Sequence, residues 1–457
     1  MKTSINLRCP KCRTALRYEE KTNGYVCGNG CEYPVVDDIP RFVPAETYAS
    51  SFGLQWRTFR RTQLDSFTGT SISRDRLVRL VGGSLQIFRN REVLEAGCGA
   101  GRFTELMLRA GARVFAADIS SAVEANYLNC RNFENYFVCQ GDMVNLPVEP
   151  GQFDIVFCAG VIQHTPRPEE TMAKLCSYVS PGGLLVMDHY TYTYPVTLSR
   201  KILRAFLTNR SPRFSMAFCT ATVRVLWPLH RLSFALRWLP KMHRIRYGFM
   251  GLSPVVDYQD DHPQLGPELL FHWALLDTHD TVTDRFKHLR TAKEIQDHLG
   301  NCGMVDLDVV YGGNGVEARA RKPVDHERAD EQTSSLIDHL DGYVKFDWDS
   351  FELKRPFRKV QGYAWLAELP EYQDSADCAE YPLRSPLFLD EDRANVGPGH
   401  SSHFDIIGRG QGRYSHWGEG VIFSSSDNTD PNTNGRNYSI RVRRASRSTD
   451  SAMKAQS

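Results

Sequence analysis

A short apolar stretch that runs into a glycine-rich turn, VLEAGCGAGRF at residues 93–103, most constrains the fold of this chain. Apolar residues precede the glycines and a helical pattern follows them, so the stretch predicts a strand, a tight loop and a helix. Short apolar runs continue to alternate with helical segments up to about residue 188. This alternation predicts an α/β fold with a doubly wound, mostly parallel sheet. Ligands of such sheets bind beyond the carboxyl ends of the strands.

Three nucleotide-binding patterns compete for the loop GCGAGR. A Walker-type phosphate loop requires Lys followed by Ser or Thr after the glycines, and this pair is absent. A dinucleotide fold requires Gly or Ala at the sixth position, where Arg102 stands. The pattern that remains is G-x-G-x-G, formed by Gly97, Gly99 and Gly101 and preceded by Glu95.

Two acidic residues follow the next two expected strands. Asp118 ends the run ARVFAAD, where a carboxylate can accept hydrogen bonds from both hydroxyls of a ribose. Asp142 follows the run YFVCQ, where it can meet an exocyclic amine of an adenine, and Met143 can pack on the ring. With these two aspartates at this spacing, the glycine motif predicts a nucleotide-binding site more specifically than it does alone.

These residues resemble the motifs of class I S-adenosylmethionine-dependent methyltransferases. VLEAGCGAGRFTE resembles their first motif, AADIS their ribose-binding strand end and GDMVNLP their adenine loop. The resemblance is strongest over residues 90–190, extends to about residue 320 and implies a seven-stranded Rossmann-like sheet. It also implies S-adenosylmethionine as the cofactor, bound by Glu95, Gly97, Gly99, Gly101, Asp118, Ile119, Asp142, Met143 and Gly160.

The stretch AGVIQHTP follows the fourth expected strand. Relatives that methylate adenine or glutamine amides carry an Asn/Asp-Pro-Pro-aromatic turn here, so the resemblance favours an oxygen or carbon acceptor. A hydroxyl acceptor needs a base, and histidine suits this role because its pKa lies near the working pH. His164 and His189 follow the fourth and fifth strands and are the main candidates for the catalytic base, and Asp277 with His279 forms a third.

Four of the twelve cysteines form two close pairs near the N-terminus. Cys9 and Cys12 form C-x2-C, and Cys27 and Cys31 form C-x3-C after a gap of 14 residues. Two such pairs suit a tetrahedral zinc site, and four thiolate ligands would make it structural because no coordination position stays open. The next residues, YPVVDDIPRFVP, resemble the exit of zinc ribbons found in, or partnering, many methyltransferases.

Residues 189–256 contain eleven Lys or Arg residues and no Asp or Glu. Apolar runs such as VRVLWPLHRLSFALRWL lie between the basic residues. Basic amphipathic helices with Trp and Leu suit an anionic membrane surface, so we expect peripheral membrane contact through residues 200–246. A lid packed on the domain, with Arg stems covering apolar surface, and contact with RNA are the alternatives.

The last third of the chain has a different composition. Alternating segments such as VQGYAWLAEL and GEGVIFSSSD, broken by Pro, Gly and Asn, predict a small β-rich domain. GRYSHWGEGVIFSSSDNTDPNTNGRNYSI resembles a segment of proteins from bacterial surface-polysaccharide gene clusters. The predicted organisation is a zinc ribbon (1–45), a methyltransferase domain (46–325) with a basic apolar insertion (190–265), a β-rich accessory domain (326–442) and a disordered tail (443–457).

The overall composition limits the partners and the compartment. A net charge of +1 argues against a dedicated nucleic-acid binder, so no nucleic acid is an expected partner. The N-terminus MKTSINLRCPKC has no apolar segment of a secretory signal, so we expect a cytoplasmic protein, peripheral at most on the inner face of a membrane. The expected function is O-methylation of a small-molecule or lipid-linked glycan precursor. A non-catalytic cofactor-binding scaffold and an RNA methyltransferase are the alternatives.

Overall fold

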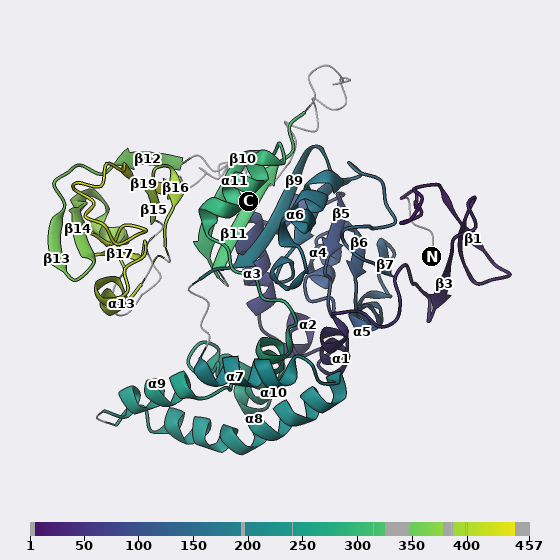
Figure 1. The fold of residues 1–457 in the computed structure, drawn as a ribbon, viewed down its shortest axis with the longest axis horizontal. Helices are drawn as coiled ribbons and strands as arrows, with labels where there is room; N and C mark the ends of the chain where they lie inside the picture. Colours follow the sequence, from purple (N-terminus) through teal and green to yellow (C-terminus); the bar gives the residue numbers. More distant parts are fainter. Residues whose placement is uncertain are drawn as a thin grey trace, which may run out of the picture.

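The computed structural model of the chain has a small N-terminal sheet, a central sheet flanked by helices, a layer of further helices and a C-terminal β-rich part (Figure 1). The structure describes residues 5–192, 197–239, 241–313, 315–324, 348–377, 385, 387–397, 399 and 401–443. Residues 326–347 at the start of the predicted β-rich domain, and the predicted disordered tail except for Arg443, lie outside the described residues. The domain boundaries therefore stay predictions.

A seven-stranded sheet with the order β10-β11-β9-β8-β5-β6-β7 forms the centre of the molecule. Among the strands of this sheet only β11 runs in the direction opposite to the other six, so the mostly parallel α/β fold is confirmed. The strand order reverses beside β5, which carries the glycine loop, and this is where such sheets bind ligands. The strands are β5 (Glu92–Ala96), β6 (Arg113–Asp118), β7 (Tyr136–Gln140), β8 (Phe153–Cys158), β9 (Val179–Tyr190), β10 (Val305–Gly312) and β11 (Gly315–Arg321).

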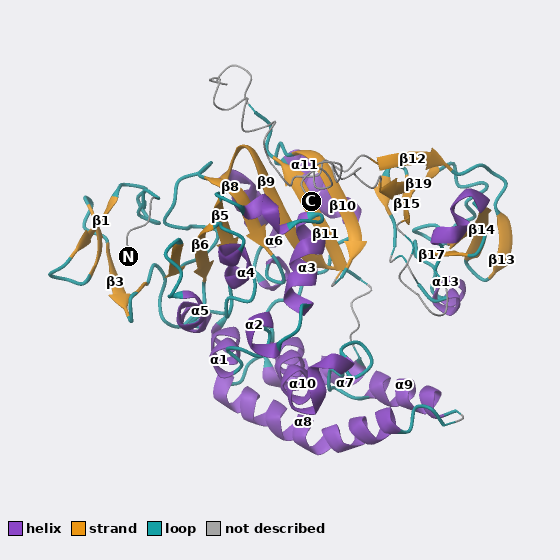
Figure 2. Ribbon diagram, turned by 180° about the vertical axis from the view of Figure 1, so that it is seen from behind, coloured by secondary structure: helices purple, strands orange, loops and turns teal. Residues whose placement is uncertain are grey.

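Helices cover both faces of the central sheet (Figure 2). Apolar side chains of α3, α4 and α5 pack on one face, and those of α6 and α11 pack on the other. Almost every strand residue between these layers is buried, as expected for parallel strands covered on both sides. The helices are α3 (Ile72–Val81), α4 (Thr104–Arg109), α5 (Ala122–Cys130), α6 (Pro168–Tyr178) and α11 (Ala292–Asn301).

A layer of helices below the sheet in Figure 1, called the lid here, has an apolar core of its own that includes Trp227 and Trp273. The lid contains most of the predicted insertion together with α1 and α10. No helix in the described ranges combines the length and apolarity that crossing a membrane requires. The lid helices are α1 (Ser50–Thr58), α7 (Leu198–Leu207), α8 (Pro212–Ala235), α9 (Met242–Leu252) and α10 (Gly266–Thr283), and the short α2 (Asp65–Thr68) links α1 to α3.

The N-terminal sheet packs against the β7 side of the central sheet. Its apolar residues Leu7, Tyr33 and Phe42 join the core beneath α6, and the backbone N–H of Phe42 donates to the carbonyl of Gln140, the last residue of β7. Its four strands are β1 (Leu16–Glu19), β2 (Gly24–Cys27), β3 (Glu32–Val36) and β4 (Ile39–Pro40).

The C-terminal part is β-rich, as the sequence predicts, and packs against the β10 side of the central sheet. The backbone N–H of Tyr311 in β10 donates to Asn395 Oδ1 at 2.9 Å. One sheet has the order β12-β19-β15-β16 and the other β13-β14-β18-β17. The elements are β12 (Trp348–Glu352), β13 (Arg358–Gln361), β14 (Ala364–Glu368), β15 (Leu387–Glu391), β16 (Ala394–Asn395), α13 (His403–Gly408), β17 (Tyr414–Trp417), β18 (Gly420–Phe423) and β19 (Tyr438–Arg443).

Candidate functional site

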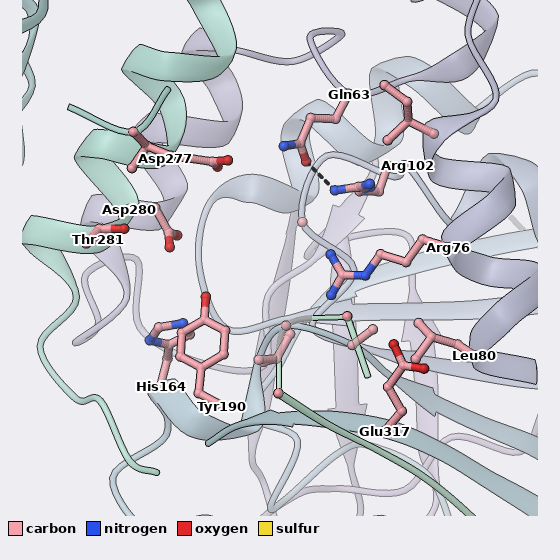
Figure 3. A pocket seen from close by; sticks show the side chains of 18 of the residues that line it. Gln63, Arg76, Leu80, Arg102, His164, Tyr190, Asp277, Asp280, Thr281 and Glu317 are labelled. Atoms are coloured by element: carbon pink, nitrogen blue, oxygen red, sulfur yellow. Dashed lines mark hydrogen bonds between the residues drawn. The ribbon is translucent and has the colours of Figure 1, made fainter. Parts of the chain in front are cut away.

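A cavity of about 1460 Å³ lies at the carboxyl ends of β5, β6 and β8, between the sheet and the lid. One side, the strand wall, is formed by residues at strand ends, among them Glu95, Asp118 and Met143. The rest of the lining, called the helix wall here, comes from helices: Arg76 of α3 lies on one side of the cavity, and side chains of α10 lie across from it (Figure 3). The predicted site therefore coincides with the place where the topology expects a ligand.

The glycine loop forms the floor of the strand wall. Gly97 and Gly99 line the cavity and have φ angles of +80° and +48°. A Cβ atom on Gly97 would collide with the side chain of Val161, and one on Gly99 would lie 3.3 Å from the Trp56 ring. Gly101 lies outside the cavity lining, and a Cβ there would press on Asn126 of α5. The first two glycines thus leave space beside the cavity, and the third permits close helix packing.

Asp118 connects the end of β6 to the glycine loop. Its Oδ2 accepts a hydrogen bond from the backbone N–H of Gly99 at 3.1 Å, and its Oδ1 accepts bonds from the backbone and hydroxyl of Ser120. Burial raises the pKa of the carboxyl, while these hydrogen bonds oppose the rise. Each carboxylate oxygen can accept more than one bond, so Asp118 can still receive hydroxyl donors from the cavity, which Ile119 also lines.

Met143 and Tyr48 close the far end of the strand wall. Met143 is buried against the sheet core and lines the cavity, whereas Asp142 does not line it. Asp142 Oδ1 accepts a bond from the backbone N–H of Val144. Burial is the main cause that raises the pKa of Tyr48, and the charges of Asp142 and Asp118 add to it. The phenol therefore stays neutral. Tyr48 was not predicted from the sequence.

Glu95 lies behind the glycine loop. The Glu95 carboxyl accepts a hydrogen bond from the Thr104 hydroxyl, and burial raises its pKa to about 8. A carboxyl in this state exchanges its proton near neutral pH, so the charge of this end of the cavity depends on the ligand beside it.

An ion pair joins the strand wall to the helix wall. Arg76 Nη2 lies 2.5 Å from Asp188 Oδ2, and Asp188 Oδ1 accepts a bond from the backbone N–H of Gly160 at 2.5 Å. Burial alone would lower the pKa of Arg76, but Asp188 raises it, so the guanidinium remains charged. Gly160 has a φ of +76° and lines the cavity, as the predicted cofactor set requires. The sequence analysis did not identify Arg76 or Asp188.

His164 lies at the end of the short helix η2 (Ile162–His164), with its ring between Phe52 and Tyr190. Its Nδ1 lies 3.1 Å from the carbonyl oxygen of Phe286 and 3.4 Å from Asp284 Oδ2. Burial would lower the pKa of His164, but Asp284 and Asp280 raise it above the ordinary value. With the proton on Nδ1 held by Phe286, Nε2 is the atom that can accept a proton from the cavity.

The other two predicted histidines lie outside the cavity lining. His189 is fully buried on the opposite face of β9, its Nδ1 bonds the carbonyl of Tyr190, and burial lowers its pKa to about 4. His279 bonds Gln55 Oε1 at 2.7 Å, and burial also lowers its pKa to about 4. Neither His189 nor His279 lines the cavity, whereas His164 does.

The helix α1 covers the mouth of the cavity. Trp56 lies over Gly99, and Phe52 packs on His164. A Cβ at Gly53 would lie 2.5 Å from Ser121 Oγ, so α1 sits directly against the loop that follows β6. Residues far apart in the sequence therefore enclose the strand wall.

The four paired cysteines gather at one end of the N-terminal sheet. The Sγ atoms of Cys9, Cys12, Cys27 and Cys31 all lie within 4.8 Å of one another. Thiolates around a tetrahedral zinc ion lie about 3.8 Å apart, since each Zn–S bond is about 2.3 Å. The hydroxyl of Tyr33 lies 3.1 Å from Cys9 Sγ, which is the kind of second contact that orients a metal-bound thiolate. The cluster therefore fits a four-thiolate metal site.

Comparisons with known proteins bear on the central part of the chain. Residues 94–187 match a family model described as a methyltransferase domain. These residues carry the glycine loop, the strand-end aspartates Asp118 and Asp142, and His164, but not His189. The central α/β unit is therefore a class I methyltransferase domain, of the kind that uses S-adenosylmethionine.

Relatives with curated functions match the same region. The chain is 27% identical over 126 residues to the ubiquinone biosynthesis O-methyltransferase of Azoarcus sp. (strain BH72), which is 27% of this chain and 54% of that protein. It is 30% identical over 125 residues to the mitochondrial enzyme of that name from Schizosaccharomyces pombe, covering 26% of this chain and 43% of the relative. The chain thus spans about half the length of the curated relatives it matches.

Solved structures give a more distant likeness. A putative S-adenosyl-L-methionine-dependent methyltransferase from Methanococcus maripaludis is 11% identical with a TM-score of 0.33, covering 63% of this chain and 99% of that one. Magnesium protoporphyrin IX methyltransferase from Synechocystis PCC 6803 with bound SAH is 16% identical with a TM-score of 0.31, covering 60% and 96%. At these scores neither structure bears on substrate or mechanism.

Proposed function

We propose that the protein transfers a methyl group from S-adenosylmethionine to a hydroxyl of a small-molecule or lipid-linked acceptor, in particular a glycan precursor. The supporting observation is that one cavity contains the glycine loop, Asp118, Met143 and a carboxylate-oriented histidine, His164. The methyltransferase domain match covers the strands that carry these groups.

The strand wall suits the cofactor. Gly97 and Gly99 bring bare backbone to the cavity where a Cβ would press on Val161 or Trp56. Asp118 has acceptor capacity for ribose hydroxyls, and Met143 offers an apolar surface for adenine. S-adenosylmethionine, when bound, supplies a methyl carbon already activated by its sulfonium. Positioning of the acceptor beside that carbon can contribute up to about 7–11 kcal/mol to catalysis.

His164 is the proposed base. As the acceptor oxygen forms its bond to the methyl carbon and the sulfur–methyl bond breaks, the hydroxyl proton passes to His164 Nε2. The carbonyl of Phe286 and the carboxylate of Asp284 orient Nδ1 and stabilise the protonated ring. His189 is not proposed for this role because it is buried away from the cavity.

Calorimetric titration with S-adenosylhomocysteine tests this proposal. We expect binding to the wild type and at least about tenfold weaker binding to Asp118→Ala, since hydrogen bonds to a charged group contribute roughly 1.5–3 kcal/mol. Asp297→Ala, which removes an exposed carboxylate on α11, is the control and should bind normally. Absence of binding to the wild type would contradict the proposal. Binding without turnover on any acceptor would instead favour a scaffold, and salt-sensitive RNA binding would favour an RNA substrate.

We also propose that the outer face of the lid contacts an anionic membrane surface. Large apolar side chains there are unusually exposed, with Trp238 at 80%, Leu252 at 77% and Val225 at 72%. Four basic residues of the stretch make internal contacts, among them Arg204 with Asp284 and Arg246 with Asp257. The remaining seven are exposed: Lys201, Arg210, Arg213, Arg224, Arg231, Lys241 and Arg244. Each basic residue near an anionic surface contributes about 1 kcal/mol.

Flotation with lipid vesicles tests the membrane contact. We expect the wild type to float with vesicles of phosphatidylglycerol and phosphatidylcholine but not with phosphatidylcholine alone. Trp238→Ser combined with Arg231→Glu should abolish flotation, whereas Phe404→Ser, which removes an aromatic side chain of similar exposure from the C-terminal part, should not. Equal flotation of the wild type with the anionic vesicles and with phosphatidylcholine vesicles would overturn this proposal.

We further propose that zinc occupies the four-cysteine cluster and stabilises the N-terminal sheet. Metal analysis should find one zinc ion per chain, as expected for a closed four-thiolate site. Cys9→Ser should lose the metal, while Cys219→Ser, a buried cysteine of the lid, should retain it. A full complement of zinc in Cys9→Ser would contradict this assignment.

A further inference from the structure

Charged side chains of opposite sign face each other across the cavity. Arg76 and Arg102 lie on one side, and Asp277 and Asp280 project from α10 on the other (Figure 3). Among the described residues, no ion pair within 4.0 Å connects these two pairs. The cavity therefore offers a ligand both a cationic and an acidic surface, beside the proposed base.

Among the residues that the structure describes, Arg102 has only neutral hydrogen-bond partners. Its Nη1 donates to Gln63 Oε1 at 2.5 Å, and its Nε donates to Ser73 Oγ at 3.2 Å. Burial, followed by the nearby charge of Arg76, lowers the pKa of Arg102 to about 9. In the described part of the chain no carboxylate lies within 4.0 Å of this guanidinium. A largely desolvated cation without a counter-ion is unfavourable, so an anion supplied by a ligand would be bound strongly here.

Arg76 provides the contrast within the same cavity. It already has a counter-ion, because Asp188 contacts its Nη2 and is itself almost fully buried. Arg76 therefore adds positive potential near Arg102 without needing an anion of its own. Arg76 has a carboxylate partner and Arg102 has none within 4.0 Å among the described residues. Arg102 is therefore the arginine whose positive charge an anionic ligand would balance.

The acidic side suits hydroxyl groups. Burial and then the charge of Asp280 raise the pKa of Asp277 to about 7, and burial also raises the pKa of Asp280. A buried carboxyl group with a raised pKa can donate a hydrogen bond to a ligand hydroxyl when it is protonated, and can accept one in either state. The desolvation cost of binding is low because the group is already buried. Both side chains lie on the α10 face directed at His164, where the reacting hydroxyl would be.

We propose that the acceptor is a polyol that carries an anionic group, a carboxylate or a phosphate, as in a uronic acid or a sugar phosphate. Arg102 binds the anionic group, and Asp277 and Asp280 bond the hydroxyls, which directs one of them towards His164. This inference rests on the proposed function, since it concerns the acceptor of the same reaction.

Binding of soluble probes to the protein saturated with S-adenosylhomocysteine tests the proposal. The probes are glucuronate, glucose 1-phosphate, inorganic phosphate and glucose, measured by ligand-observed NMR. We expect the anionic sugars to bind at least about tenfold more tightly than glucose, since a charge-assisted bond contributes roughly this factor. Arg102→Gln should abolish the preference and Arg102→Lys should retain part of it. Asp277→Asn should weaken all three sugars alike.

The control variant is Arg131→Gln, because Arg131 is exposed after α5 and lies outside the cavity lining. It should keep the full preference. A preference that survives Arg102→Gln, or no binding of the anionic probes to the wild type, would overturn the proposal. A loss of S-adenosylhomocysteine affinity of more than about tenfold in Arg102→Gln would also overturn it, because the guanidinium would then bind the carboxylate of the cofactor. Absence of cofactor binding in the wild type would instead refute the proposed function itself.

Discussion

The two walls of the cavity are assembled in different ways. Most of the strand wall comes from residues 95–143, where the polar groups stand at the end of a strand or in the loop that follows it. The helix wall combines Arg76 of α3 with Asp277 and Asp280 of α10, which are distant in the sequence and meet only through packing of the lid. Local sequence therefore specifies the wall proposed for the cofactor, while the wall proposed for the acceptor depends on tertiary structure.

The largest expected effect comes from breaking the ion pair that joins the walls. Arg76→Gln leaves Asp188 buried without its counter-ion, which should lower the free energy of unfolding by about 3–5 kcal/mol. Urea denaturation measures this change. Arg74→Gln on the same helix is the control, because its 3.8 Å pair with Asp75 is exposed and should contribute less than about 1 kcal/mol. An equal loss of stability in Arg76→Gln and Arg74→Gln would show that the ion pair between Arg76 and Asp188 does not stabilise the contact between the two walls.

Two glycine substitutions compare the walls directly. Gly97→Ala places a Cβ against Val161 at a positive φ, which should cost about 2–4 kcal/mol and abolish S-adenosylhomocysteine binding. Gly251→Ala, at a lid position that also lines the cavity but has open space around it, should leave binding unchanged. Calorimetry and thermal denaturation measure both effects. Normal cofactor binding by Gly97→Ala would refute the assignment of the strand wall.

The protonation of His164 reports on the contact between the walls. Because Asp284 and Asp280 raise its pKa above 6.5, the ring should be protonated up to a higher pH than a free imidazole. Asp280→Asn removes one of these charges and should shift the titration of His164 to lower pH. NMR of the histidine ring measures the midpoint. The buried His189 serves as an internal reference, since its pKa is about 4 and it should not titrate in this range.

The smallest effect is expected outside both walls. Thr291 and Glu294 form a capping box at the start of α11, so Thr291→Ala should cost about 1 kcal/mol of stability. Cofactor affinity should not change. Lys293→Ala, in an exposed pair with Asp297, should cost less than about 0.5 kcal/mol by the same denaturation measurement. An altered cofactor affinity in Thr291→Ala would show that α11 influences the cavity.

The central sheet and the glycine loop could be predicted because their signals are local. Strand alternation could also have shown that His189 shares a face with Leu185 and Met187, although only the structure shows that Asp188 and Tyr190 face the cavity side. In the same way, helical spacing separates His279 from Asp277 and groups Asp277 with Asp280. The partners of Arg76 and Arg102 could not have been predicted, since they depend on contacts between distant segments.

Both outermost strands of the central sheet are engaged by the appended parts of the chain. The N-terminal sheet bonds the end of β7 through Phe42, and the C-terminal part bonds β10 through Asn395. Unpaired strand edges are templates for pairing with other chains, and natural proteins protect them. A fragment trimmed to the central unit would free the backbone groups that Phe42 and Asn395 bond at these edges, and we expect it to self-associate more than the longer chain. Recombinant work on this protein therefore calls for the whole chain, even where only methyl transfer is studied.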